Sequence, residues 1–215
     1  MSDFATQRLA MVDSQVRPND VTDLRLQNAL LAVARERFVP AHLQAVAYME
    51  GCVEVQAGRF LLDARSFAKL AQLAAIRPGD TVLDVGCATG YSSSVLSHLA
   101  ANVVALEEDP RLVGLARENL RGTANVGLVQ GALTAGHRPL APYDVIFVNG
   151  AVGVRPGSLL AQLKDGGRLV CIASYRSAGR ACLYVRTDAA FSECDAFEAQ
   201  APLLPGFTKA PGFVF

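Results

Sequence analysis

A turn with two glycines carries the strongest chemical signal in this sequence. The stretch LDVGCATGYSS at residues 83–93 follows an apolar run, and its glycines, Gly86 and Gly90, are spaced as G-x-x-x-G. Glycines let a ligand approach the backbone closely, and the free N–H groups of a following helix would face that ligand. The next apolar run ends in Glu107, about twenty residues beyond the turn, where an acid can hold ribose hydroxyls. Glu108 lies beside it, so the acid is assigned to within one residue.

The turn has three possible interpretations. A dinucleotide site needs G-x-G-x-x-G, but Tyr91 stands where the third glycine would be, which disfavours that ligand. An ordinary strand-to-helix turn, with glycines for geometry alone, is the plainest alternative. The pattern with its upstream acid instead resembles motif I of class I S-adenosylmethionine-dependent methyltransferases. That resemblance implies contacts to the cofactor's amino-acid part from Asp84, Gly86, Cys87, Ala88, Gly90 and Tyr91. Ala88 stands where a glycine is usual.

The elements that would position this turn alternate between short apolar runs and helical patterns. Such alternation predicts β-α-β units and an α/β fold with a doubly wound, mainly parallel sheet. The class I resemblance implies a Rossmann-like sheet of seven strands. We expect an α/β domain over residues 78–215 and a helical lead-in over residues 1–77, together one structural unit. The predicted strands are 81–86, 102–107, 125–130, 143–150, 168–174 and 181–187, and the predicted helices are 3–15, 22–36, 66–76, 91–100, 109–120 and 157–164.

Composition limits the function further. The 215 residues carry 20 basic and 20 acidic side chains, so no overall field favours nucleic acid or an anionic membrane. The longest apolar run, at residues 29–34, is too short for a membrane span, and the N-terminus has no signal-peptide core. The five cysteines lie far apart, which argues against a metal site and against a disulfide scaffold. We expect a cytoplasmic protein without nucleic-acid or membrane partners.

Further motifs narrow the resemblance to one family. RERFVP at 35–40, AY at 47–48, the RPGD segment leading into the glycine turn, APYDVIFVNGAV at 141–152 and LLAQLKDGGRLV at 159–170 recur in this order in protein-L-isoaspartate O-methyltransferases. The similarity covers about residues 7–173. It implies methyl transfer from S-adenosylmethionine, which becomes S-adenosylhomocysteine, to the free carboxylate of an isoaspartyl residue in a protein or peptide. That carboxylate is already anionic at pH 7, so no general base is needed, and we expect no catalytic histidine.

Two departures from the family pattern concern the site itself. The family carries a Ser-Gln-Pro group whose serine lies at the acceptor site, and Leu62 is aligned with that serine. Ser66, one helical turn further on, is the nearest hydroxyl that could substitute. The family's Gly-Asp-Gly beside the adenine is replaced at Gly131, Ala132 and Leu133. The resemblance still implies adenine contacts there, with one acceptor lost at a cost of about 0.5–1.5 kcal/mol.

Four other features have open interpretations. Asn149, at the end of a predicted strand, lies near the transferred methyl group and the cofactor or else forms a turn with the next glycine. Arg59 and Arg65 pair with an anionic acceptor or are solvated loop charges. Cys87 has no paired histidine and is expected to be a small buried residue. The apolar tail at 202–215 folds back or forms an interface strand.

Three hypotheses for function remain at this stage. The first is a methyltransferase with an altered acceptor, and the second is the standard isoaspartyl repair enzyme. The third is a family member that binds the cofactor without catalysis and acts as a sensor or interaction protein. Fold alone cannot choose among them.

Overall fold

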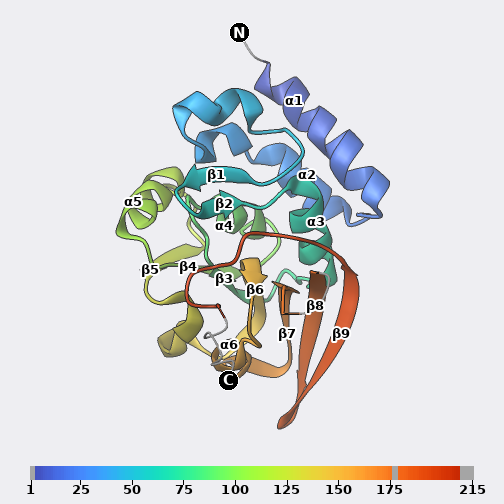
Figure 1. Ribbon diagram of the computed structural model, residues 1–215, viewed down its shortest axis with the longest axis vertical. Helices are drawn as coiled ribbons and strands as arrows, with labels where there is room; N and C mark the ends of the chain where they lie inside the picture. Colours follow the sequence, from blue (N-terminus) through green and yellow to red (C-terminus); the bar gives the residue numbers. More distant parts are fainter. Residues whose placement is uncertain (1–2, 176–178, 209–215) are drawn as a thin grey trace, which may run out of the picture.

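The computed structural model describes residues 3–175 and 179–208. A seven-stranded sheet forms its centre, in the order β5-β4-β3-β6-β7-β8-β9 (Figure 1). The first five strands of that order are mutually parallel, and β8 is antiparallel to both of its neighbours. The strands are β3 (Thr81–Val85), β4 (Asn102–Glu107), β5 (Val126–Gln130), β6 (Tyr143–Val152), β7 (Leu163–Ala173), β8 (Arg180–Thr187) and β9 (Ala190–Glu198). The predicted fold class is therefore confirmed.

Successive side chains of the strands feed opposite layers of the core. Val82 and Phe147 join one apolar cluster, whereas the residues that follow them, Leu83 and Val148, join the other. This is the period of two that a sheet buried on both faces requires. The helices around the sheet are α1 (Phe4–Met11), α2 (Leu24–Ala32), α3 (Ala64–Leu73), α4 (Tyr91–Leu96), α5 (Pro110–Asn119) and α6 (Gly157–Leu160).

The lead-in is more irregular than its apolar periodicity predicts. After α1 the chain continues as a π-helical turn at Val12–Val16, and two 3₁₀ turns, Arg35–Phe38 and Ala41–Val46, follow α2. A short hairpin of β1 (Val53–Gln56) and β2 (Arg59–Leu61) then lies between these helices and the sheet (Figure 1). Its apolar side chains share one core cluster with the lead-in and with one face of the sheet.

Several predicted boundaries were wrong. The helix predicted at 22–36 is shorter, Leu24–Ala32, and it is capped by Asp23, whose side chain accepts from two helix N–H groups. The helix predicted at 157–164 is a single turn, α6, and the strand predicted at 168–174 begins earlier, so that β7 includes Gly166 and Gly167. By contrast, the helix predicted at 109–120 agrees with α5, which Asp109 caps and which has a proline at its first position, the preferred arrangement.

The segment after β9, residues 199–208, is called the strap here. It runs back across the edge of the sheet above β8, β7 and β6 (Figure 1). Backbone bonds fasten it to β6: Ala151 N–H donates to the Pro202 carbonyl at 2.9 Å, and Leu204 N–H donates to the Ala151 carbonyl at 2.9 Å. Of the two interpretations of the apolar tail, the fold-back is confirmed for residues 202–208, and the remainder lies outside the described residues. No helix of the described residues is long and apolar enough to cross a bilayer.

Candidate functional site

The carboxyl ends of three neighbouring strands meet where the sheet order reverses. From β3 the chain proceeds outward to β4 and β5 and then returns to β6 on the other side of β3. Such a switch point is where open α/β sheets bind ligands. The glycine turn follows β3, Glu107 ends β4, and Asn149 lies near the end of β6. The structure thus brings together predicted site residues that are far apart in the sequence.

The backbone of the glycine turn uses left-handed conformations at three positions. Gly86 has φ 78°, Gly90 has φ 96° and Ala88 has φ 50°. The two glycines adopt this region freely, whereas an L-alanine is strained there. A methyl group on Gly86 would meet side-chain atoms of Leu204 at 3.1 Å and of Arg59 at 3.4 Å. The turn is therefore tightly covered from outside.

Asp84 lies at the centre of a buried polar cluster behind the turn. Its carboxylate accepts hydrogen bonds from the hydroxyls of Ser92 and Ser93 and from the side-chain amide of Asn149. Burial raises the pKa of Asp84 to about 6, and the neighbouring charge of Glu107 also raises it, while the three donors oppose the shift. Asn149 forms no turn, because β6 continues to Val152, and its amide orients toward Asp84.

Glu107 is completely buried, and its carboxylate is already saturated with donors. Arg59 approaches it with two nitrogens, Nη1 at 2.5 Å from Oε1 and Nη2 at 2.6 Å from Oε2. The backbone N–H groups of Ala88, Glu108 and Asp109 donate to the same carboxylate at 2.8, 2.9 and 3.1 Å. A carboxylate offers about four lone-pair sites, so these five bonds leave none for a ribose diol. Glu108 is partly buried, and its Oε2 lies 3.4 Å from the backbone nitrogen of Leu133.

The strap closes the same region from the other side. Leu204 is buried, and a methyl group on Gly150 would lie only 2.7 Å from its Cγ. Phe207 is also buried, and its carbonyl accepts from Gly153 N–H at 2.7 Å. Both side chains belong to the core cluster on the α6 side of the sheet. The glycine at position 150 is therefore needed for the strap to approach β6.

The cavity left at the glycine turn is very small. Its volume is about 10 Å³, and it is bordered by Phe60, Leu62, Phe67, Tyr91 and Asn149 as well as by the turn itself. A second cavity of about 10 Å³ lies between β2 and the strap. One water needs about 10–15 Å³, whereas pockets for drug-sized ligands measure about 300–1,000 Å³. In this arrangement the turn admits at most a single water.

The loop predicted to meet an adenine is also packed inward. Gly131 N–H donates to the Glu107 carbonyl at 3.0 Å, and the side chain of Leu133 is fully buried. Ala132 is exposed. A methyl group on Gly206 of the strap would lie 2.8 Å from Thr134, so the strap also contacts this loop. The adenine role of these residues remains a prediction.

Cys87 and Tyr91 are both buried beside the turn. Burial, with the charges of Asp84 and Glu107, raises the pKa of the Cys87 thiol well above its ordinary value, which suits a packed thiol and not a nucleophile. The Tyr91 ring packs against Phe38 and Phe67 at centroid distances of 5.6 and 5.9 Å. These contacts give both residues a packing role in this arrangement.

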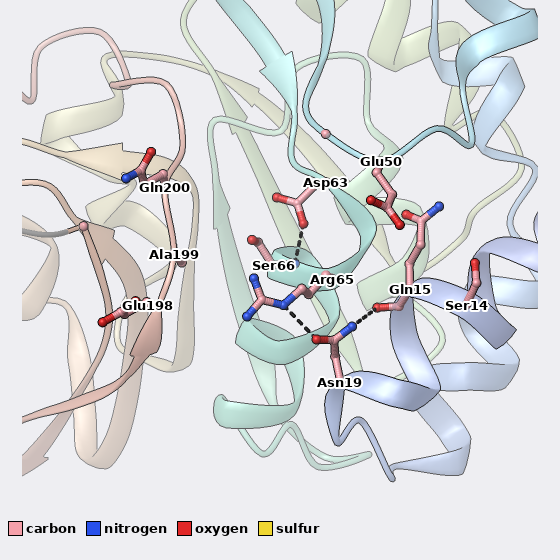
Figure 2. A pocket seen from close by; sticks show the side chains of 12 residues that line it. Ser14, Gln15, Asn19, Glu50, Asp63, Arg65, Ser66, Glu198, Ala199 and Gln200 are labelled. Atoms are coloured by element: carbon pink, nitrogen blue, oxygen red, sulfur yellow. Dashed lines mark hydrogen bonds between the residues drawn. The ribbon is translucent and has the colours of Figure 1, made fainter.

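Leu62 and Ser66 face two different spaces. Leu62 is buried and borders the small cavity, whereas Ser66 lines an open pocket of about 520 Å³ between α3, the lead-in and the end of β9 (Figure 2). Asp63 caps α3 by accepting from Ser66 N–H at 2.8 Å. Arg65 lies beside them, and its Nε donates to the Asn19 side chain at 2.9 Å. The acceptor roles of Leu62 and Ser66 remain predictions.

The lead-in motif RERFVP acts as a structural joint. The guanidinium of Arg35 is buried, donates to the carbonyls of Ala47 and Leu62 at 2.8 and 2.9 Å, and lies 4.7 Å from the centre of the Tyr91 ring. The Phe38 carbonyl accepts from the Thr89 hydroxyl at 2.6 Å. These contacts fix the lead-in, the segment around Leu62 and the glycine turn relative to one another.

Sequence reasoning missed two participants. Arg59 was considered for an anionic acceptor, but its partner is Glu107, 48 positions away. Leu204 was seen only as part of an apolar tail. The one signal that could have indicated the pairing is a basic residue within the acceptor-side segment, GRFLLDARSF at 58–67, where apolar residues surround it.

Comparison with known proteins agrees with the fold and the motifs. Residues 7–195 match the family model of protein-L-isoaspartate(D-aspartate) O-methyltransferase. A protein-L-isoaspartate O-methyltransferase of Koribacter versatilis is 36% identical over 79% of this chain and 78% of its own length. One of Protochlamydia amoebophila is 38% identical over 74% of this chain and 77% of its own.

Two solved structures share the fold at low sequence identity. A protein-L-isoaspartate O-methyltransferase superimposes with a TM-score of 0.80 at 22% identity, covering 95% of this chain and 67% of that one. A Plasmodium falciparum protein described as a beta-aspartate methyltransferase, solved with S-adenosyl-L-homocysteine, gives a TM-score of 0.79 at 17% identity, covering 95% of this chain and 99% of that one. With the family model matched over most of its length and close relatives at more than 30% identity, this chain belongs to the protein-L-isoaspartate O-methyltransferase family.

Proposed function

We propose that this chain is an S-adenosylmethionine-dependent methyltransferase that esterifies a carboxylate on a protein or peptide. The observation that carries the proposal is the switch-point arrangement of the glycine turn, Glu107 and Asn149 in a chain of this family. The relatives are named as methyltransferases of isoaspartyl protein, which does not favour a non-catalytic sensor.

The open pocket beside α3 is the proposed acceptor site. It has room for a side chain and its flanking peptide backbone, and it presents Arg65 and Ser66 at the start of α3 (Figure 2). A guanidinium pairs with a carboxylate, and Ser66 supplies a hydroxyl that Leu62 lacks. Arg65 is the one basic residue among the described residues that line the pocket, and it is the cation that an anionic acceptor would meet there. Three acidic residues, Glu50, Asp63 and Glu198, line the same pocket. This role for Ser66 corresponds to a changed acceptor arrangement within the family.

The residues at the turn do not fit the cofactor in the arrangement described above. The small cavity cannot hold it, and the carboxylate of Glu107 has no acceptor site left for it. A test of function must therefore allow for a closed site.

The test is methyl transfer from labelled S-adenosylmethionine to an isoaspartyl peptide and to its aspartyl isomer. The protein is assayed as wild type and as Leu204→Ala, which removes the side chain that covers Gly86. Base-labile label in either peptide supports the proposal, and preference for the isoaspartyl isomer identifies the repair substrate. Label in neither peptide with either protein refutes carboxylate methylation of these acceptors.

A further inference from the structure

We propose that Arg59 and the strap together hold the cofactor site shut, and that S-adenosylmethionine binds only after both have moved away. This inference rests on the proposed function, because it concerns the regulation of that same site. Three independent observations carry it: the saturated carboxylate of Glu107, the packing of Leu204 against two glycines, and the small volume of the cavity at the glycine turn.

Arg59 acts as a substitute for the ligand at Glu107. Its two nitrogens occupy both carboxylate oxygens, and only 6% of its side chain is exposed. If Arg59 leaves, Oε1 keeps the N–H groups of Glu108 and Asp109, while Oε2 keeps only that of Ala88. One acceptor position on Oε2 then becomes available. Departure of this one side chain is thus necessary for a hydroxyl to reach Glu107, and the backbone donors can stay in place.

Leu204 fills the space that the glycines keep open. Gly86 directly follows β3, and Gly150 lies within the neighbouring strand β6. A methyl group on Gly86 would lie 3.1 Å from Leu204, and one on Gly150 would lie 2.7 Å from it. The side chain of a single strap residue therefore covers both positions at which a ligand could approach the backbone closely. A cofactor that contacts Gly86 would therefore clash with Leu204 in its present position.

The strap is built to detach without unfolding the sheet. It is the last described segment of the chain. Outside its own turn, three backbone hydrogen bonds fasten it to β6 and the loop after β6, and a fourth joins its first residue, Ala199, to Gly179. Three side chains of the strap are buried: Leu204 and Phe207 near the site, and Ala199 at its start. Leu203, by contrast, is 44% exposed. Segments with few buried apolar contacts open locally at low free-energy cost. Arg59 belongs to a three-residue strand of a two-stranded hairpin, which is also a marginal element.

A closed site lowers the measured affinity by the fraction of molecules that are open. The apparent dissociation constant equals the intrinsic constant divided by that fraction, so an open population of about 1% weakens binding about a hundredfold. Changes that release the strap should raise the affinity even though they remove protein contacts. Gain of affinity on loss of a side chain is the signature of this mechanism.

The experiment measures binding of S-adenosylhomocysteine by calorimetry to the wild type and to three strap variants. Leu204→Ala removes the side chain over the glycines, and Phe207→Ala removes the distal anchor without touching the turn. Leu203→Ala is the matched control, since it is the same residue type in the same strap but exposed. We expect at least tenfold tighter binding for Leu204→Ala and Phe207→Ala and an unchanged constant for Leu203→Ala. Hydrogen exchange on the wild type provides a second measurement.

Exchange should distinguish displacement from simple binding. Because the ligand would replace the strap, adding S-adenosylhomocysteine should speed amide exchange in residues 199–208, whereas ligands usually slow exchange where they bind. Equal affinity of wild type and Leu204→Ala, with the strap equally or better protected, overturns the inference but leaves the proposed function standing. Absence of binding in all four proteins overturns the proposed function and the inference with it.

Discussion

The buried pair of Arg59 and Glu107 gives the sharpest test of the structure. We consider Arg59→Met, which keeps length and apolar bulk, and Glu107→Gln, which keeps an acceptor oxygen for the backbone N–H groups around it. Both partners are almost fully buried, at 6% and 0% side-chain exposure, and they are joined by two short bonds. Removing one partner of such a pair leaves an uncompensated buried charge and costs about 3–5 kcal/mol.

The assay is urea unfolding of the two single variants and the double variant. Each single change should lower the free energy of unfolding by about 3–5 kcal/mol. The double variant should lose about 2–3 kcal/mol less than the sum of the two single losses, because its second change no longer leaves a buried charge without a partner. The pair of Lys164 and Asp144, which is more exposed at 42% and 22% side-chain exposure, is the control. Lys164→Met should cost less than about 1 kcal/mol. A cost for Arg59→Met no larger than this control, or strictly additive costs, would refute the buried pairing.

Three further predictions concern single positions. Asp84→Asn should remove a pH dependence, because the buried native carboxyl has its pKa raised from 3.8 to about 6 and so binds a proton more tightly than the unfolded chain does. The free energy of unfolding of the wild type relative to the variant should therefore fall by about 2 kcal/mol between pH 4 and pH 7. A flat difference in urea titrations across that range would contradict the burial argument. Ala75→Gly should stabilise the protein by about 0.5–1 kcal/mol, because Ala75 is exposed and has φ 48°. Ala88→Gly should leave the stability nearly unchanged, because it also removes a buried methyl group. A loss of stability above about 1 kcal/mol in Ala75→Gly would argue against this conformation. Leu62→Ser should cost about 2–5 kcal/mol in thermal or urea unfolding, and Ser66→Ala, whose capping bond uses the backbone N–H, less than about 1 kcal/mol; equal costs would show that Leu62 is not packed as described.

Local patterns predicted the sheet because its strands are short apolar runs, and the runs at 81–86, 102–107 and 143–150 are each followed by a helix signal. The position of Glu107 followed from the same logic, since the spacing from the glycine turn sets which residue ends the next strand. The cap of α5 was predictable because Asp109 and Pro110 act on their own helix. These features depend on interactions within about twenty residues of sequence, which is the range that periodicity and capping rules address.

The closure of the site could not be predicted in this way. Arg59 reaches Glu107 from 48 positions away, and the strap pairs with β6 about 50 residues earlier in the chain. A local pattern does not distinguish an arginine that meets solvent from one that lies over a buried carboxylate. Strand β9 was likewise missed, because its residues alternate little in polarity and most of them are exposed.

The electrostatics of the closed site indicate which contact controls opening. A buried carboxylate without a partner is costly, so a chain that keeps Glu107 for a ribose must compensate its charge when no ligand is present. Arg59 supplies that compensation through two charge-assisted bonds and a full positive charge, whereas ribose hydroxyls can donate to the carboxylate but bring no opposite charge. Ribose contacts alone therefore cannot displace Arg59. The remaining free energy must come from the rest of the cofactor occupying the space of Leu204, which makes release of the strap and release of Arg59 a coupled event. It follows that Leu204→Ala and Glu107→Gln should shift cofactor affinity in opposite directions, the first tightening and the second weakening it, although both remove native contacts of the same closed site.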